Sequence, residues 1–230
     1  MFIKKIFSIA FVCVVSVQAL PILQLDVVNG TYDSNTETDM AGSNSSVLRA
    51  LLNDSKYVGQ DFYISLAITP QQELSSTVPD FGTIVFADKT FESSDFVYGV
   101  PPIENGSIVQ YKDAGDLPTH SIFPTYYTEY KFKFDDSKIA AYNAQDNSTS
   151  SGTLFYKDFL VDISNIKDGY AVHFDLYNEA FKRNGDIDIK LSAPFSHDAG
   201  AQKVPEPATI SLIAISIAGL CFKKYKSWFS

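Results

Sequence analysis

The side chains best suited to chemistry are His173 and Asp175, which lie two positions apart in a segment of alternating apolar and polar residues. Residues two apart on a strand point to the same face. The pair can therefore ligate a metal, or act as a general base and the carboxylate that orients it. The opposite face of the same segment is apolar: Tyr170, Val172, Phe174 and Leu176. A structural polar contact is the simpler explanation of the pair, and we favour it.

Two pairs of closely spaced aspartates are the next candidates, Asp186 with Asp188 and Asp113 with Asp116. Short oxygen-rich spacings of this kind bind calcium in loops, although the twelve-residue EF-hand pattern is absent. Solvated acids in turns explain such pairs more often. Asp186 and Asp188 are kept as calcium candidates, and no other metal or cofactor is expected. Paired carboxylates also suggest glycoside hydrolysis. That reaction requires a defined distance between two carboxyl groups, which the spacing along the sequence does not give.

Enzyme signatures are missing from the sequence: it contains no nucleophile elbow, phosphate loop, dinucleotide-binding glycines or His-Glu-x-x-His motif. There are only three histidines, and His197-Asp198 is expected in a loop near the end of the domain. Both cysteines, Cys13 and Cys221, fall in terminal apolar segments, so the middle of the chain has no disulfide or thiol nucleophile. We therefore expect a protein without catalytic or cofactor-binding residues.

The elements that position these residues are predicted to be strands, because apolar residues across 20–203 alternate with period two and aromatic residues are abundant. The pattern predicts one all-β domain, a β-sandwich of a possible jelly-roll type. Residues 46–53 fit a helix or a strand, and 199–204 are expected to be a linker. The expected strands lie near 22–28, 63–68, 82–86, 129–134, 159–163, 170–176 and 187–191.

The amino terminus has the pattern of a signal peptide, with two lysines before an apolar run. Small residues precede Leu20, and we expect cleavage between Ala19 and Leu20. The sequence therefore predicts an exported protein with a signal peptide at 1–19 and an extracytoplasmic domain at 20–203.

The domain between the two ends is more acidic than the net charge of −9 for the whole chain implies. The terminal segments hold five of the 18 basic residues and one of the 27 acidic residues, which leaves 13 against 26, or about −13. Such a surface repels nucleic-acid phosphates and anionic lipid, so we expect no nucleic-acid partner.

The carboxyl terminus carries Val204, Pro205, Glu206 and Pro207, then an uncharged run to Phe222 and a cluster of lysines. The apolar run is 15 residues long and needs its aromatic flanks to span a membrane, with the lysines held in the cytoplasm. This order resembles the PEP-CTERM sorting signal of Gram-negative bacteria. The resemblance implies a membrane-anchored precursor, processing by an exosortase, and transfer to the cell surface or its polysaccharide matrix.

Segments of the domain resemble the exported bacterial family called choice-of-anchor N, whose members share one domain and end in different surface anchors. The resembling segments are 120–134 (HSIFPTYYTEYKFKF), 169–178 (GYAVHFDLYN), 193–199 (APFSHDA) and, more weakly, 97–103 (VYGVPPI). This resemblance implies an extracytoplasmic domain and transfers no catalytic residue.

Three functions follow as hypotheses from these observations. The first is a non-enzymatic surface or matrix protein. The second is a carbohydrate-binding module supported by calcium, and the third is a glycan hydrolase that uses acids near His173 and Asp175. We rank them in this order.

Overall fold

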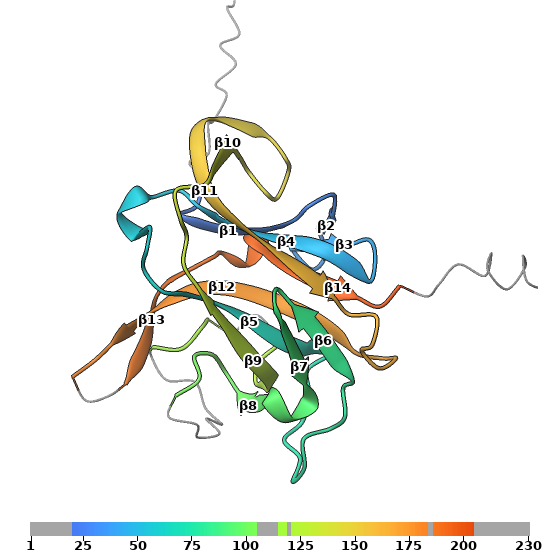
Figure 1. Ribbon diagram of the computed structural model, residues 1–230. Coiled ribbons are helices and arrows are strands. Elements are labelled where there is room, and N and C mark those ends of the chain that lie inside the picture. The colour runs from blue at the N-terminus through green and yellow to red at the C-terminus, as the bar shows by residue number, and fades with distance from the viewer. Residues whose placement is uncertain (1–19, 105–114, 119–120, 184–185, 205–230) are drawn as a thin grey trace, which may run out of the picture.

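Two sheets pack face to face and enclose a shared apolar core (Figure 1). The computed structural model describes residues 20–104, 115–118, 121–183 and 186–204. Within these ranges the regular structure is strand, apart from three short 3₁₀ helices. The prediction of an all-β sandwich is confirmed at this level, and the jelly-roll type stays a prediction.

The first sheet has six strands and is built around β11, the longest strand in the described part of the chain. Its order is β1 (Leu23–Val27), β4 (Ser45–Leu52), β11 (Thr149–Asp162), β6 (Thr83–Phe86) and β7 (Lys89–Glu92), with β10 (Lys138–Tyr142) also paired to β11. Every pair in this sheet is antiparallel.

The second sheet has eight strands and contains β12, the strand that carries His173 and Asp175. Its order is β2 (Thr31–Asp33), β3 (Thr38–Ala41), β14 (Asp198–Gln202), β12 (Ala171–Phe181), β5 (Phe62–Thr69), β9 (Thr125–Phe132) and β8 (Val97–Gly99), with β13 (Ile187–Ser192) also paired to β12. The pair of β3 and β14 is parallel, and the other pairs are antiparallel.

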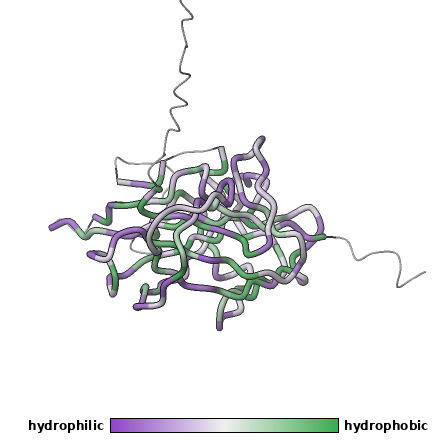
Figure 2. Tube along the Cα trace, turned by 90° about the horizontal axis from the view of Figure 1, so that it is seen from above, coloured by the Kyte–Doolittle hydropathy of each residue, from purple (hydrophilic) through white to green (hydrophobic). Residues whose placement is uncertain are grey.

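The core lies between the sheets and is filled by the apolar positions of the alternating strands. Phe86 and Phe159 from the first sheet stack at 5.3 Å between ring centroids, and Phe174 of the second sheet lies 5.9 Å from Phe86. Such ring pairs add to the free energy gained from burying the apolar area itself. Figure 2 shows the hydrophobic segments in the interior and hydrophilic segments at the outlying loops.

Each strand expected from the alternation is present: β1, β5, β6, β9, β11, β12 and β13. The segment 46–53, which fits either a helix or a strand in the sequence, lies up to Leu52 in β4 (Ser45–Leu52), which pairs with β1 on one side and β11 on the other.

The expected linker at 199–204 is wrong, because β14 (Asp198–Gln202) lies inside the second sheet between β3 and β12. Four of its five residues are buried. The expected loop position of Asp198 is wrong for the same reason, while the neighbouring residues Phe195–His197 form a 3₁₀ helix.

A second, smaller apolar cluster covers part of the outer face of the second sheet. Tyr127 and Tyr177 from the sheet pack there against Val100, Leu117 and Phe123 of the segments that cross it. Both faces of β12 are therefore buried, which is why seven consecutive residues from Val172 to Asn178 are shielded from solvent.

Candidate functional site

The site forms on the outer face of the second sheet, where the strand register brings His173, Asp175 and Asp198 together. On β12, His173 pairs with Gly200 of β14, so the next outward-facing residue of β14 is Asp198, beside Asp175. Asp175 in turn pairs with Ser65 on β5. The imidazole and the two carboxylates thus come from two neighbouring strands of one sheet.

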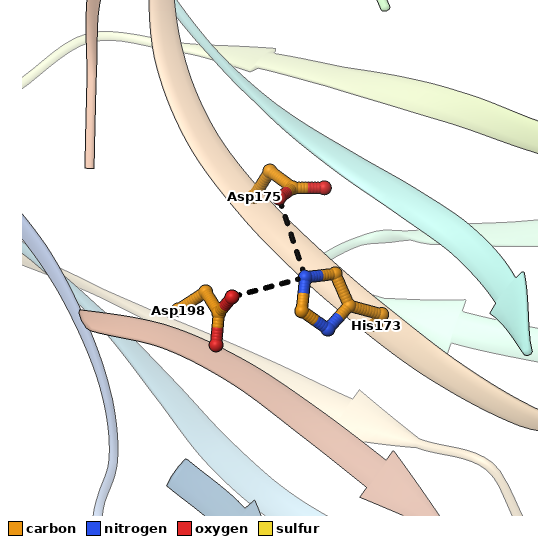
Figure 3. A group of neighbouring side chains, drawn as sticks. All are labelled: His173, Asp175 and Asp198. Carbon is orange, nitrogen blue, oxygen red and sulfur yellow. Dashed lines mark hydrogen bonds and ion pairs between the residues drawn. The ribbon is translucent and has the colours of Figure 1, made fainter. Parts of the chain in front are cut away.

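A single imidazole nitrogen contacts both carboxylates (Figure 3). Nε2 of His173 lies 3.3 Å from Oδ1 of Asp175 and 3.3 Å from Oδ2 of Asp198. The Oγ hydroxyl of Ser65 donates a 2.8 Å hydrogen bond to Oδ2 of Asp175, which leaves Oδ1 for the histidine. The ligand atoms of the three side chains lie within 4.8 Å of one another, so they are able to hold a metal ion.

Burial is nearly complete for this group, with 5% of His173, 5% of Asp175 and 3% of Asp198 exposed. Oδ1 of Asp198 is also buried, and no described residue forms a hydrogen bond with it. The Thr38 hydroxyl donates to the carbonyl of Thr36 at 3.0 Å, and it also acts on the Asp198 carboxyl group, whose pKa it lowers. A buried polar atom without a partner lowers the stability of the fold by about 1–3 kcal/mol. A hydrogen-bond donor or a cation next to this carboxylate oxygen would recover that cost.

The charges in the group depend on one another. Burial disfavours the charged imidazolium, but Asp175 and Asp198 outweigh it and raise the pKa of His173 to about 10. Burial raises the pKa of Asp198, and His173 opposes this change. A positive imidazole between the two carboxyl groups is thus the favoured state of the protein at neutral pH in the absence of a metal.

An open pocket of about 620 Å³ reaches this group from the surface. His173 and Asp198 form part of its wall, together with residues of the loop before β3 and the ends of β12 and β14. The wall is mixed in character: Thr36, Thr38, Ser121 and Gln202 are polar, while Ile122 and Phe195 are apolar. A small polar ligand or an ion can therefore approach His173 and Asp198 from this side.

Farther along β12 the same face carries a second polar group. The Tyr177 hydroxyl donates a 2.6 Å hydrogen bond to Oε1 of Glu129, which also accepts from the backbone amide of Ile103 at 2.8 Å. Burial raises the pKa of Glu129. Burial, reinforced by the charge of Glu129, raises the pKa of Glu179 to about 7.

The calcium candidates Asp186 and Asp188 lie at the hairpin between β12 and β13, next to Lys182. The lysine Nζ is 2.6 Å from Oδ1 of Asp188 and 3.9 Å from Oδ2 of Asp186. The structure also brings the other acidic segment here, because the backbone amide of Ile189 donates to the carbonyl of Gly115 at 2.8 Å. Calcium at this place would have to compete with the ammonium group. Asp116 is buried, and Asp113 lies outside the described residues.

His197, the other described histidine, is held in a structural contact rather than with Asp198. One ring nitrogen lies 2.8 Å from Oγ of Ser196 and the other 2.8 Å from Oδ1 of Asn143. Burial lowers the pKa of His197. The signal-cleavage residue Ala19 and the motif residues Pro205, Glu206 and Pro207 lie outside the described residues, as does His120.

Sequence reasoning found His173 and Asp175 but missed Asp198 as the third member of the group. The signal available was weak: an aspartate followed by small residues that can pack in a sheet. Only the pairing of β14 with β12, between segments about 25 residues apart, reveals the contact.

No family model matches this chain, and neither a curated protein nor a solved structure shows significant similarity to it. The two family resemblances seen in the sequence therefore remain predictions. In the part of the chain that the structure describes, no helix has the length and hydropathy needed to cross a membrane.

Proposed function

We propose that this chain is the precursor of a non-enzymatic surface or matrix protein, whose β-sandwich is exported, released from a membrane anchor by an exosortase, and retained in the extracellular polysaccharide of a Gram-negative bacterium. The terminal segments carry the two signals that this pathway requires, a signal peptide for export and a sorting signal for the exosortase. The acidic, cysteine-free sandwich is the part that remains after processing.

One structural observation carries the proposal: the last described residue is fastened to the sandwich directly before the Pro-Glu-Pro motif. The Val204 amide donates to Oδ1 of Asn44 at 2.7 Å, and Nδ2 of Asn44 donates to the Val204 carbonyl at 3.2 Å. A transpeptidase that cuts the chain after the Val204–Asn44 contact would leave every described strand of the sandwich in place. The amino-terminal end agrees, since Leu20 packs against the cluster that contains Leu51.

The burial of the best chemical group supports a non-enzymatic role. His173, Asp175 and Asp198 are each at least nine-tenths buried, and their imidazole is engaged by carboxylates. A hydrolase would need a carboxyl pair on an open cleft with room for substrate and water.

The experiment follows the full-length chain in a Gram-negative host, with and without its exosortase. We expect the shorter, processed form in the medium or matrix only when the enzyme is active. A Glu206→Gln variant should accumulate as the membrane-bound precursor, whereas the matched Glu73→Gln variant, altered at an exposed acid of the sandwich, should be processed normally. Full-length protein that persists equally in both strains, or a sandwich that stays in the cytoplasm, would refute the proposal.

The open pocket beside Thr36 and Gln202 favours a second candidate, a carbohydrate-binding module. Polar groups around an apolar patch suit neutral sugars, and an acidic surface does not repel them. A glycan array probed with calcium and then with chelator tests this candidate. Uniform signal across all polysaccharides would remove it.

A further inference from the structure

We propose that His173, Asp175 and Asp198 form a binding site for one divalent transition-metal ion, with Zn²⁺ as the best fit. The site goes beyond the surface role proposed above, since display and sorting require no metal.

The distances favour a metal over a hydrogen-bonded ion cluster. Nε2 of His173 lies 3.3 Å from an oxygen of each carboxylate, whereas charge-assisted N–H···O bonds are about 2.7–2.9 Å long. Neighbouring ligand atoms of a tetrahedral zinc ion with bonds of about 2.0 Å are separated by about 3.3 Å. The two distances from Nε2 match this separation, and all three ligand atoms lie within 4.8 Å of one another. One nitrogen also has only one hydrogen, so without an ion the two carboxylates share it in a three-centre hydrogen bond, which is weaker for each carboxylate than a separate bond. An ion placed between the three atoms satisfies both contacts together.

The unpartnered oxygen of Asp198 is an independent sign of a missing ligand. Oδ1 is buried without a hydrogen bond from any described residue, although burying a carboxylate oxygen in this way is costly. A bound cation would compensate the charge of this carboxylate, through Oδ2 alone or through both oxygens.

The surroundings have the features of a metal site. The Ser65 hydroxyl holds Oδ2 of Asp175 at 2.8 Å and so turns Oδ1 toward the imidazole, which is the usual role of a group behind a ligand. The strands fix the three side chains before any ion arrives. The pocket at His173 and Asp198 supplies both an entry path and room for a water molecule as fourth ligand.

The donor set selects the ion. Calcium and magnesium take oxygen ligands and rarely nitrogen, whereas an imidazole with two carboxylates suits zinc and its neighbours. Two carboxylates also balance the charge of a divalent ion bound to a neutral imidazole. This site is distinct from Asp186 and Asp188, where Lys182 already supplies the positive charge.

The test uses the full-length chain in detergent, stripped with chelator and with Cys13 and Cys221 alkylated. Titration with ZnCl₂ is followed by calorimetry, and Co²⁺ is added separately for its visible absorption. We expect one zinc ion per chain and the intense bands of four-coordinate Co²⁺. Asp198→Asn should weaken zinc binding at least about 100-fold, and Ser65→Ala about 10-fold to 100-fold, because it changes only the support of a ligand.

The matched control is Asp188→Asn, which should bind zinc like the unchanged protein. Because Asp198→Asn could disturb folding, circular dichroism is recorded for each variant, and Ser65→Ala provides a second test without removing a ligand. Absence of a one-to-one zinc site, or equal zinc affinity in Asp198→Asn and Asp188→Asn, would overturn the proposal and leave a metal-free ion cluster. A site that binds Ca²⁺ but neither Zn²⁺ nor Co²⁺ would overturn it as well.

Discussion

The two faces of β12 are both buried, but different interactions stabilise them: apolar packing on the inner face, and ion pairs with hydrogen bonds on the outer face. On the inner face, Val172, Phe174 and Leu176 pack against the apolar residues of the other sheet. On the outer face, the alternate residues include His173 and Asp175, which form ion pairs and hydrogen bonds. The inner face therefore gains free energy from area removed from water, and the outer face must recover the cost of desolvating its charges.

This difference between apolar packing and buried charges indicates which face of β12 can carry function. Apolar packing tolerates a swap of similar volume, because it depends on shape and not on a particular partner. The stability of a buried charge depends on one particular partner, since removal of either charge leaves the other uncompensated. A face of the second kind is retained for stability only if its network is complete. The unpartnered oxygen of Asp198 shows that among the described residues it is incomplete.

The largest effect is expected on the inner face from Phe174→Ala. Phe174 is 1% exposed and lies 5.9 Å from the Phe86 ring, so the substitution leaves a cavity at the centre of the sandwich. We expect unfolding in urea to show a loss of about 3–5 kcal/mol. Phe181→Ala on the same strand is the control, because that ring is 74% exposed and should change stability by no more than about 0.5 kcal/mol. Similar losses in the two variants would contradict the inner-face packing.

The adjacent residue tests the outer face directly. His173→Gln removes the cation between Asp175 and Asp198 but keeps a polar side chain of similar length. In chelator-treated protein we expect a loss of about 3 kcal/mol, near the lower limit for breaking a buried ion pair. Lys157→Gln, which breaks the exposed pair with Asp135 at 3.2 Å, should cost far less than His173→Gln, because solvent screens that pair. Equal stability of His173→Gln and the unchanged protein in urea would show that the outer face does not depend on its charges.

The inner face was predictable from the sequence, and much of the outer face was not. The alternation of Val172, Phe174 and Leu176 is a local pattern, and it identifies both the strand and its core side. It also places His173 and Asp175 together on the other side. What lies over that side depends on Val100, Leu117 and Phe123, which come from irregular segments without a period.

The third member of the site was hidden for a physical reason. β14 has the sequence DAGAQ, whose small residues give no strong hydrophobic signal, yet small residues are what its place requires. A Cβ on Gly200 would lie 2.8 Å from the Met40 sulfur of the neighbouring β3, so a larger residue there would require the flexible Met40 side chain to move. The register of β14 on its other neighbour, β12, sets Asp198 beside Asp175. Pairing across the chain, and not local propensity, decides this strand.

A smaller effect on the outer face is expected from Tyr177→Phe. The ring and its packing in the second apolar cluster are kept, but the 2.6 Å hydrogen bond to the buried Glu129 is lost. We expect thermal and urea unfolding to show a loss of about 2 kcal/mol, because a buried carboxyl group loses a donor. Tyr130→Phe is the matched control, since its hydroxyl donates at 3.0 Å to Asp88 in an exposed contact, and a loss below about 1 kcal/mol is expected. A reversed order of the two losses would contradict the assigned burial of Glu129.

The last effect is a dependence on pH at Glu179, where the outer face meets solvent. Burial and the nearby Glu129 raise the pKa of Glu179 to about 7 in the folded protein, from an unfolded value near 4.5. Between these values the folded state retains a proton that the unfolded state has released, so this group's stabilising contribution is complete below about pH 4.5 and is lost as pH rises through 7. Glu179→Gln should remove that loss.

The measurement for Glu179 is the melting temperature of the variant minus that of the unchanged protein, recorded from pH 4.5 to 8. We expect this difference to become more positive with rising pH and to level off above about 7. Glu73→Gln, at an exposed acid, is recorded alongside as the matched control. A difference for Glu179→Gln that falls with pH would mean that the carboxylate is favoured in the fold, and that the outer face accommodates charge at its edge as easily as it does in the group around His173.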